Sequence, residues 1–379
     1  MATRAENIQL RTDFSLTIGG ELEQSKQHSD VINPALGAVF ARCPAAGSAE
    51  LDRAVAAARA AFKSWRNTSY AERAALVKRM SQLLRDNQSA LAELLTREQG
   101  KPLAQSIAEI DRGAAQSDGM VGIEIPVETL VDDKDRHIEL RYRPLGVVGI
   151  ITPWNAPVNL ALGPLVSALY TGNTVVLKPS PYTPLTTLKV GELIKDVFPA
   201  GAVNVLAGGD DLGRVMTEHR DIDKISFTGS VATGKKVLAS AAGTLKRVTL
   251  ELGGNDPAII LDDVDPKAIA KKVFFASFVN SGQVCMAIKR IYAHEKIYDG
   301  LCAALAAEAK KAKVGDGLDP GTELGPLQNK MQYDKVVDLI NDTKKAGARF
   351  LAGGEIPSGP GYFLATSIVT GCTDAAARS

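Results

Sequence analysis

The sequence predicts an α/β fold with a doubly wound, largely parallel sheet. From residue 146 onward, short apolar runs alternate with segments of helical length. The runs contain few polar residues, which is typical of parallel strands that are buried on both faces. Such an alternation of strands and helices builds doubly wound sheets. The length of 379 residues favours two or three domains, because one hydrophobic core rarely serves so long a chain.

Composition and charge exclude several classes of protein. Hydrophobic residues make up 45% of the chain and charged residues 23%, which is typical of a globular protein rather than a disordered one. Lys and Arg number 44 against 43 Asp and Glu, so the net charge of +1 gives no reason to expect nucleic acid as a partner. The apolar run at 146–151 is far shorter than the ~20 residues that cross a bilayer, and residues 1–14 are polar. We therefore expect neither a membrane partner nor export.

Cysteine and histidine spacings predict no metal site. Cys43, Cys285, Cys302 and Cys372 form no Cys-x-x-Cys pair, and the four histidines show no ligand spacing. Scattered thiols fit a reducing compartment, so we expect a cytoplasmic protein. Cys43, Cys302 and Cys372 lack polar or Gly-rich surroundings, and we interpret them as small buried hydrophobic residues.

The first third of the chain predicts three helices. Ser48 is expected to cap the first, in which apolar residues recur at helical spacing over 51–62. Residues 69–72 match a capping box ahead of the second helix. A third apolar helix, at 91–95, is expected to run on and end at Gly100.

The central part of the chain predicts the sheet. The expected strands are Val147–Ile151, Thr174–Leu177, Val203–Leu206, Lys224–Phe227 and Val248–Leu250. The helical segments expected between them are Pro184–Phe198, Leu212–Glu218 and Val231–Ala241. A further strand at Ala258–Leu261 and a helix after Pro266 indicate a second α/β domain. Residues 124–143 break the alternation and predict an extended arm or hairpin, because polar and apolar residues alternate there.

Residues 227–236 form a Gly-rich connection between a predicted strand and a predicted helix. Backbone N–H groups and a helix N-terminus hold anions at such places. The spacing of Gly229, Gly234 and Lys235 begins like a Walker A loop, but Lys236 stands where a magnesium-binding Ser or Thr is required. A strict Gly-x-Gly-x-x-Gly fingerprint is also missing. A P-loop NTPase and a turn without a ligand both stay open at this point.

Cys285 follows a Gly-Gln turn at the end of a predicted helical stretch, where a thiol can face a cleft. A free thiol has a pKa of about 8.5, so use as a nucleophile requires a nearby base or an electropositive setting. The alternative is a small buried hydrophobic residue.

Three polar residues end predicted strands: Asn155, Lys178 and Glu251. The carboxyl ends of strands form the edge where open α/β sheets bind ligands. The side-chain NH₂ of Asn155 can serve as an oxyanion donor, and a carboxylate such as Glu251 lines many active clefts. The alternatives are a turn-forming Asn155 and an exposed or salt-bridged Glu251.

Taken in order, several motifs resemble the aldehyde dehydrogenase superfamily. They are Pro153-Trp154-Asn155, Lys178-Pro179-Ser180, Phe227-Thr228-Gly229-Ser230 with Gly234, Glu251-Leu252-Gly253-Gly254 and Gly282-Gln283-Val284-Cys285. The stretches 32–37 and 98–102 are similar as well, so the resemblance covers nearly the whole chain.

The resemblance implies an aldehyde-dehydrogenase-like α/β fold with three parts. A Rossmann-like cofactor-binding domain would comprise residues 1–123 and 144–250, and an extended arm or oligomerisation hairpin residues 124–143. An incomplete α/β catalytic domain would comprise residues 251–379. Members of the family are homo-oligomers, and they continue beyond the point where this chain stops, at Ala375–Ser379, into a Glu-x-Phe-Gly-Pro motif.

The same resemblance implies roles for the residues singled out above. Cys285 would attack an aldehyde carbonyl, Asn155 would stabilise the oxyanion, and Glu251 would activate the water that releases a carboxylic acid. The cofactor would be NAD or NADP, because Pro181 stands where many NAD-preferring relatives carry a glutamate. Cofactor contacts are implied for Ile151, Thr152, Pro153, Trp154, Lys178, Ser180, Gly208, Phe227, Gly229, Ser230 and Leu252.

The substrate tunnel and two alternatives complete the expectations. The tunnel would be lined by small or apolar residues and be uncharged; the implied residues are Ala156, Asn159, Leu160, Gly163, Val284 and Met286. The chain's early stop suggests a second hypothesis, a catalytically silent subunit that binds cofactor or serves assembly. A P-loop NTPase is the third.

Overall fold

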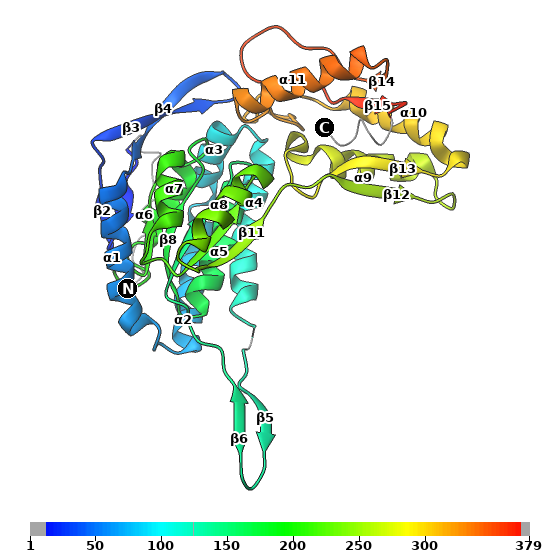
Figure 1. Cartoon of the computed structure of the whole chain (residues 1–379). Coiled ribbons are helices and arrows are strands. Elements are labelled where there is room, and N and C mark those ends of the chain that lie inside the picture. The colour runs from blue at the N-terminus through cyan, green and yellow to red at the C-terminus, as the bar shows by residue number, and fades with distance from the viewer. Residues whose placement is uncertain (1–12, 124, 373–379) are drawn as a thin grey trace. The chain divides into compact units, whose positions relative to one another are not determined.

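The computed structural model describes residues 13–123 and 125–372, and it divides into two compact units (Figure 1). The first comprises Met1–Asp30, Arg42–Ala92 and Ile107–Glu251; the second comprises Val31–Ala41, Glu93–Ser106 and Leu252–Ser379. Compared with the expected domains, segments 31–41 and 93–106 belong to the second unit, and Glu251 belongs to the first. The chain stop at Ala375–Ser379 lies outside the described residues.

The first unit holds a seven-stranded sheet in the order β11-β10-β7-β8-β9-β1-β2. The five strands from the β11 edge to β9 run parallel, and they are β7 (Val147–Ile151), β8 (Thr174–Lys178), β9 (Val203–Val205), β10 (Lys224–Thr228) and β11 (Arg247–Glu251). They confirm the predicted sheet, and no strand end differs from its prediction by more than one residue. β1 (Leu16–Ile18) and β2 (Glu21–Glu23) extend the sheet in antiparallel sense. These two strands were not predicted, because three residues are too few to show a strand's pattern of alternating or continuous apolar residues.

Helices supply the remaining core of the first unit. They are α1 (Ser48–Trp65), α2 (Tyr70–Asp86), α5 (Pro157–Tyr170), α6 (Leu185–Ile194), α7 (Asp210–Glu218) and α8 (Val231–Ala242). α3 (Gln88–Gln99) and α4 (Leu103–Met120) pass from one unit to the other. Fully buried aliphatic residues come from both sheet and helices, as with Ile150 and Leu165. Predicted α6 is shorter than expected, because it ends at Ile194 rather than at Phe198.

Two predicted helix caps have different outcomes. The capping box is confirmed, since the Ser69 Oγ accepts the Glu72 N–H at 3.2 Å and the Glu72 carboxylate accepts the Ser69 N–H at 2.8 Å. Ser48 as an N-cap is wrong, because the cap is Gly47. Gly47 has no side chain to cap the helix, and the carboxylate of Glu50 in the first turn accepts the Gly47 N–H at 2.8 Å.

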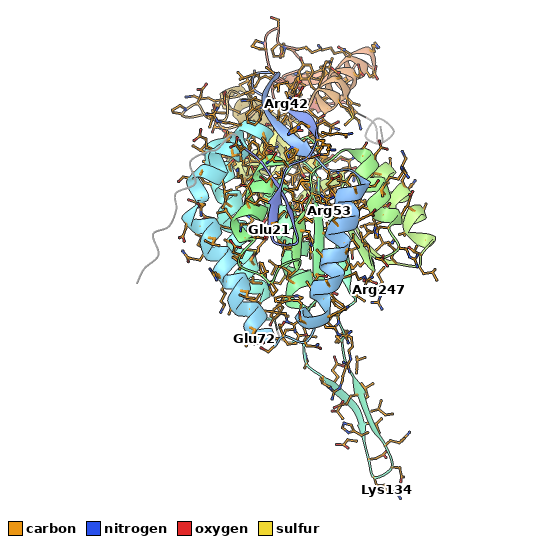
Figure 2. All side chains as sticks on the ribbon, turned by 90° about the vertical axis from the view of Figure 1, so that its left-hand side faces the viewer. Glu21, Arg42, Arg53, Glu72, Lys134 and Arg247 are labelled. Atoms are coloured by element: carbon orange, nitrogen blue, oxygen red, sulfur yellow. The ribbon has the colours of Figure 1, made fainter. Side chains whose placement is uncertain are left out.

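The predicted arm is a hairpin of β5 (Glu128–Asp132) and β6 (His137–Leu140) in antiparallel pairing. It projects from the first unit (Figure 1), and Lys134 lies at its tip (Figure 2). Leu130 and Ile138 are 60% and 42% exposed on it. The hairpin therefore leaves apolar side chains in solvent.

The second unit has a smaller α/β core. Its strands are β12 (Asp256–Ile260) and β13 (Ile288–Ala293), a parallel pair, and β14 (Arg349–Ala352) and β15 (Ile368–Thr370), an antiparallel pair. Its helices are α9 (Pro266–Phe278), α10 (Glu295–Lys311) and α11 (Lys330–Lys345), with a short 3₁₀ segment η1 (Val279–Gly282). Phe274, Leu301 and Leu324 form the centre of its core. β3 (Gln27–Asn33) and β4 (Ala38–Ala45) pair with each other. The first residues of β3 and the last residues of β4 belong to the first unit, and the rest of both strands belongs to the second.

The cysteines are all free thiols. Cys43 is buried as predicted and Cys302 is half-buried. The interpretation of Cys372 as a buried residue is wrong, because it is exposed beyond the end of β15.

Candidate active site

The chain crosses from one side of β7 to the other within the first unit's sheet. β7, β8 and β9 follow one another outward, after which the chain returns to place β10 on the opposite side of β7. This reversal is a topological switch point, and open α/β sheets bind ligands at the carboxyl ends of the strands beside it. The sheet register places Ile151 opposite Phe227 and opposite Lys178 there.

Glu251 and Lys178 lie in the same row of strand ends. Glu251 pairs with Thr228, the last residue of β10, and Lys178 ends β8. Three strand spacings separate them, which is about 14 Å at 4.8 Å per strand. The row therefore holds a carboxylate at one end and an ammonium at the other, as the sequence predicted for the two strand ends.

Lys178 is an unusually buried cation. Its side chain is 3% exposed, and its Nζ donates to the carbonyl oxygen of Pro179 at 3.4 Å. Burial lowers the pKa of Lys178 to about 8, and the nearby charge of Asp210 opposes part of that shift. The stem of Lys178 passes Gly213, where a Cβ would lie 3.7 Å from its Cε.

The Gly-rich connection after β10 leads directly into α8. Ser230 is the N-cap residue, and its Oγ accepts the Thr233 N–H at 3.1 Å. The preceding N–H groups, of Val231 and Ala232, have no partner within the helix. They form the kind of helix N-terminus that binds phosphate.

Other expected cofactor residues lie around the same edge. Thr152 follows β7; its N–H donates to the Lys178 carbonyl at 3.1 Å, and its buried Oγ1 has no partner among the described residues. Phe227 and Ser180 are buried, whereas Ile151, Pro153, Trp154 and Gly229 are half-buried. Gly208 follows β9 in close packing, because a Cβ there would lie 2.6 Å from Leu212. Leu252 directly follows Glu251 at the end of β11 and is the first residue of this part of the second unit.

Asn155 lies just before α5, whose first turn is held by a residue that sequence reasoning missed. The Oε1 of Glu109 accepts the N–H groups of Val158 and Asn159 at 3.0 and 3.1 Å. Glu109 is 6% exposed on α4, a helix the sequence analysis did not predict. A carboxylate is favourable at a helix N-terminus, so Glu109 stabilises the first turn of α5, which begins two residues after Asn155.

A cavity of about 700 Å³ lies in the first unit beside Glu251. Three expected tunnel residues, Asn159, Leu160 and Gly163, line it. The other expected tunnel residues, Ala156, Val284 and Met286, are not part of its lining. Besides Glu251, the charged residues in its lining are Arg143, Lys224 and Arg247.

Cys285 lies in the second unit, in an exposed turn between η1 and β13. The Nζ of Lys289 donates to the carbonyl oxygens of Val284 and Cys285 at 2.9 and 3.2 Å, which closes the turn. Gly254 packs against the same turn, because a Cβ there would lie 2.7 Å from the Cys285 oxygen. The alternative of Cys285 as a small buried hydrophobic residue is therefore wrong.

The Walker A interpretation has no support in this geometry. Gly234 and Lys235 lie inside α8 rather than in a loop ahead of it. Over residues 13–123 and 125–372, no three or more His, Cys, Asp or Glu side chains gather as a metal site would require. None of the helices described there has the length and apolar character needed to cross a bilayer.

The comparison with protein families decides the assignment. The family model described as the aldehyde dehydrogenase family matches residues 22–378. The chain belongs to the aldehyde dehydrogenase family. It is therefore an NAD(P)-dependent aldehyde dehydrogenase by descent, and neither the silent-subunit nor the NTPase hypothesis finds support.

Individual aldehyde dehydrogenases agree with this assignment. A probable aldehyde dehydrogenase of a Pseudomonas species is 40% identical over 366 residues, which cover 97% of this chain and 75% of that protein. The NAD+ complex of the aldehyde dehydrogenase from Bacillus cereus superposes with a TM-score of 0.93 at 37% identity, covering 96% of this chain and 76% of that one. A betaine aldehyde dehydrogenase from Staphylococcus aureus, in complex with NAD+, gives a TM-score of 0.89 at 33% identity, covering 95% and 74%.

Proposed function

We propose that this aldehyde dehydrogenase oxidises an aldehyde to the free carboxylic acid through a covalent intermediate on Cys285. The observation that carries the proposal is the exposed Cys285 turn, against which Gly254 packs. Gly254 follows Glu251 by three residues, a span of at most about 11 Å. The covalent chain itself therefore limits how far the proposed base can be from the proposed nucleophile's turn.

The first step forms a carbon–sulfur bond. The Cys285 thiol gives its proton to solvent, and the thiolate sulfur attacks the aldehyde carbon. The carbonyl π electrons move to oxygen, and the Asn155 side-chain NH₂ donates to that oxygen. The tetrahedral adduct is needed because it releases a hydride far more readily than the planar carbonyl does. NAD+ or NADP+, when bound, supplies the acceptor for that hydride.

Loss of the hydride leaves a thioester on Cys285. Glu251 takes a proton from a water molecule as that water attacks the thioester carbon. The carbon–sulfur bond breaks, the sulfur regains a proton, and a carboxylic acid leaves. The presence of Glu251 favours this hydrolytic outcome over transfer of the acyl group to another thiol.

The first unit's sheet edge fits a dinucleotide. Lys178 offers a buried ammonium for ribose hydroxyls, and the first turn of α8 offers backbone N–H groups for phosphate. The buried Oγ1 of Thr152 has no hydrogen-bond partner within the described part of the chain. Both NAD and NADP are compatible with this edge, since Pro181 brings no acidic side chain that would repel a 2′-phosphate.

We further propose a homo-oligomer that uses the hairpin of β5 and β6. An isolated two-stranded hairpin is marginally stable in water, and this one exposes Leu130 and Ile138. Light scattering of the parent and of Leu130→Lys tests this, since a smaller particle is expected for the variant. The four free thiols support a reducing compartment, and we propose the cytoplasm.

The test of the catalytic proposal is NAD(P)H formation from a panel of aldehydes, hexanal and benzaldehyde among them, by the parent and by Cys285→Ala. We expect reduced cofactor from the parent and none above background from the variant. Equal rates would show that Cys285 is not the nucleophile. Binding of cofactor without turnover by either protein would contradict the oxidation itself.

A further inference from the structure

The segment that leads into the Cys285 turn has a backbone that L-residues rarely adopt. Asn280 and Ser281 have φ values of 53° and 57°, and Gly282 follows with 77°. Among the described residues only Leu245 shares a positive φ with them outside glycine. Each such non-glycine residue is unfavourable, and such conformations persist only where surrounding contacts hold them.

Those contacts converge on Gln283. Its Nε2 donates to the Asn280 carbonyl at 3.0 Å and to the Pro326 carbonyl at 3.5 Å, and its Oε1 accepts the Gln328 N–H at 2.9 Å. The Gln283 N–H also donates to the Asn280 carbonyl, at 3.1 Å. One amide side chain thus connects the left-handed segment to residues 326–328. These hydrogen bonds of Gln283 form a clamp on the segment.

Neighbouring bonds anchor that clamp in the unit's interior. The Ser281 Oγ donates to the Gly325 carbonyl at 2.7 Å, and the Asn280 N–H donates to the Gln105 Oε1 at 3.2 Å. Gln328, which is 2% exposed, donates from its Nε2 to the Glu98 carbonyl at 3.1 Å. The 280–283 segment therefore rests on buried polar groups, which are costly to leave unpaired.

We propose that Gln283 is a positioning residue that holds the left-handed segment 280–282 and thereby fixes where Cys285 presents its sulfur. The inference rests on the proposed role of Cys285 as the nucleophile. An exposed turn without this clamp would sample several positions, and a misplacement of about 1 Å is enough to cost about 10²-fold in rate. Gln283 itself contacts no substrate in this role.

The experiment compares the parent with Gln283→Met, which keeps the length of the side chain and removes its donor and acceptor. Gln332→Met on α11 is the matched control. We expect kcat for NAD(P)H formation to fall about 30- to 100-fold in Gln283→Met, while KM changes less than about threefold. Hydrogen exchange should accelerate in peptides that cover 279–289 and stay unchanged in α9 and α10. The control should match the parent in each measurement.

A kcat within threefold of the parent would overturn the proposal, as would faster exchange spread over the whole second unit. If Gln283→Met does not fold, Gln283→Glu replaces it: the ionised carboxylate lacks the donor, and the protonated acid regains it. The ratio of variant to parent kcat should then rise as pH falls, and a flat ratio would contradict the clamp. Failure of the proposed function looks different, because Cys285→Ala would then retain activity while exchange at 279–289 still responded to Gln283→Met.

Discussion

Gly254 lies against the carbonyl oxygen of Cys285, so closely that a Cβ at residue 254 would stand 2.7 Å from that oxygen. The glycine follows β11 by three residues, and the cysteine belongs to the turn ahead of β13. The contact explains why a glycine stands at residue 254. A side chain at 254 would push the Cys285 turn away or displace Asp256, whose Oδ1 is equally close.

Gly254→Ala is therefore expected to lower kcat for NAD(P)H formation about 10²-fold, because it displaces the backbone that carries the sulfur. Gly253→Ala is the matched control, since a Cβ at 253 would meet nothing within 4 Å. Steady-state kinetics of both variants check this. Equal losses in the two variants would show that the strain lies in the backbone of the glycine pair rather than in the contact with Cys285.

Asn155→Ala is expected to lower kcat about 10²- to 10³-fold, because a preorganised oxyanion donor is lost. Asn341→Ala removes an amide from α11, a helix of the second unit that carries none of the proposed site residues, and should leave kcat unchanged. Cofactor affinity, measured by fluorescence titration, should be the same in both variants. A normal kcat in Asn155→Ala would remove this residue from the mechanism.

Lys178 makes stability depend on alkaline pH. Its pKa is lowered by burial from 10.5 to about 8, so above pH 8 the unfolded chain binds more protons at this site than the folded one does. The free energy of unfolding contributed by this site therefore rises as pH increases from about 8 to 10.5, and it is constant below 8.

Urea denaturation of the parent and of Lys178→Met at pH 8 and pH 9.5 checks that sign. The parent should gain about 2 kcal/mol relative to the variant over this interval, since each pH unit is worth about 1.4 kcal/mol. A difference between the two proteins that does not change with pH would mean that Lys178 keeps its ordinary pKa.

Gly146→Ala is expected to destabilise the first unit strongly. Gly146 has a φ of 139°, and a Cβ there would lie 1.9 Å from the Asp223 Oδ2, which accepts the Val147 N–H at 2.7 Å. The same carboxylate accepts from Arg59 at 2.8 Å, so it has little freedom to move. We expect the free energy of unfolding to fall by about 3 kcal/mol or more.

Gly119→Ala in α4 is expected to leave the free energy of unfolding unchanged or to raise it, in contrast to Gly146→Ala. A Cβ at 119 would meet nothing within 4 Å, and alanine favours the helix over glycine by about 0.5–1 kcal/mol. Thermal denaturation followed by circular dichroism should show a lower Tm for Gly146→Ala and an unchanged or higher Tm for Gly119→Ala. The same direction of change in both would contradict the packing described here.

The sequence predicted the parallel strands and the strand-end residues because both depend on local patterns. Buried runs such as β7 are apolar throughout, and Glu251 and Lys178 mark where such runs stop. Local patterns do not predict the residues that support the site, because these residues act through contacts with distant parts of the chain. Glu109 lies in the middle of a helix and reaches α5 across 49 positions, and Gln283 meets Gln328 across 45.

The positive charges in the cavity lining also depend on contacts between strands, which local patterns do not reveal. Arg247 and Lys224 each begin a strand that the apolar residues after them predict. The two cations come to one face only because the sheet register pairs them. The arm was predictable because alternation along 137–142 needs no tertiary information. How segments 31–41 and 93–106 join the second unit follows from long-range packing alone.

The covalent intermediate on Cys285 is the centre of the account, and trapping it is its most direct test. Glu251→Gln removes the proposed base and should stop turnover after thioester formation, whereas Glu355→Gln, an exposed control, should turn over normally. Intact-mass and peptide mass spectrometry after incubation with hexanal and NAD+ should show one acyl group on Cys285 and one equivalent of NADH per site. NADH formation in Glu251→Gln without an acyl group on Cys285, or with the label on another residue, would contradict the account.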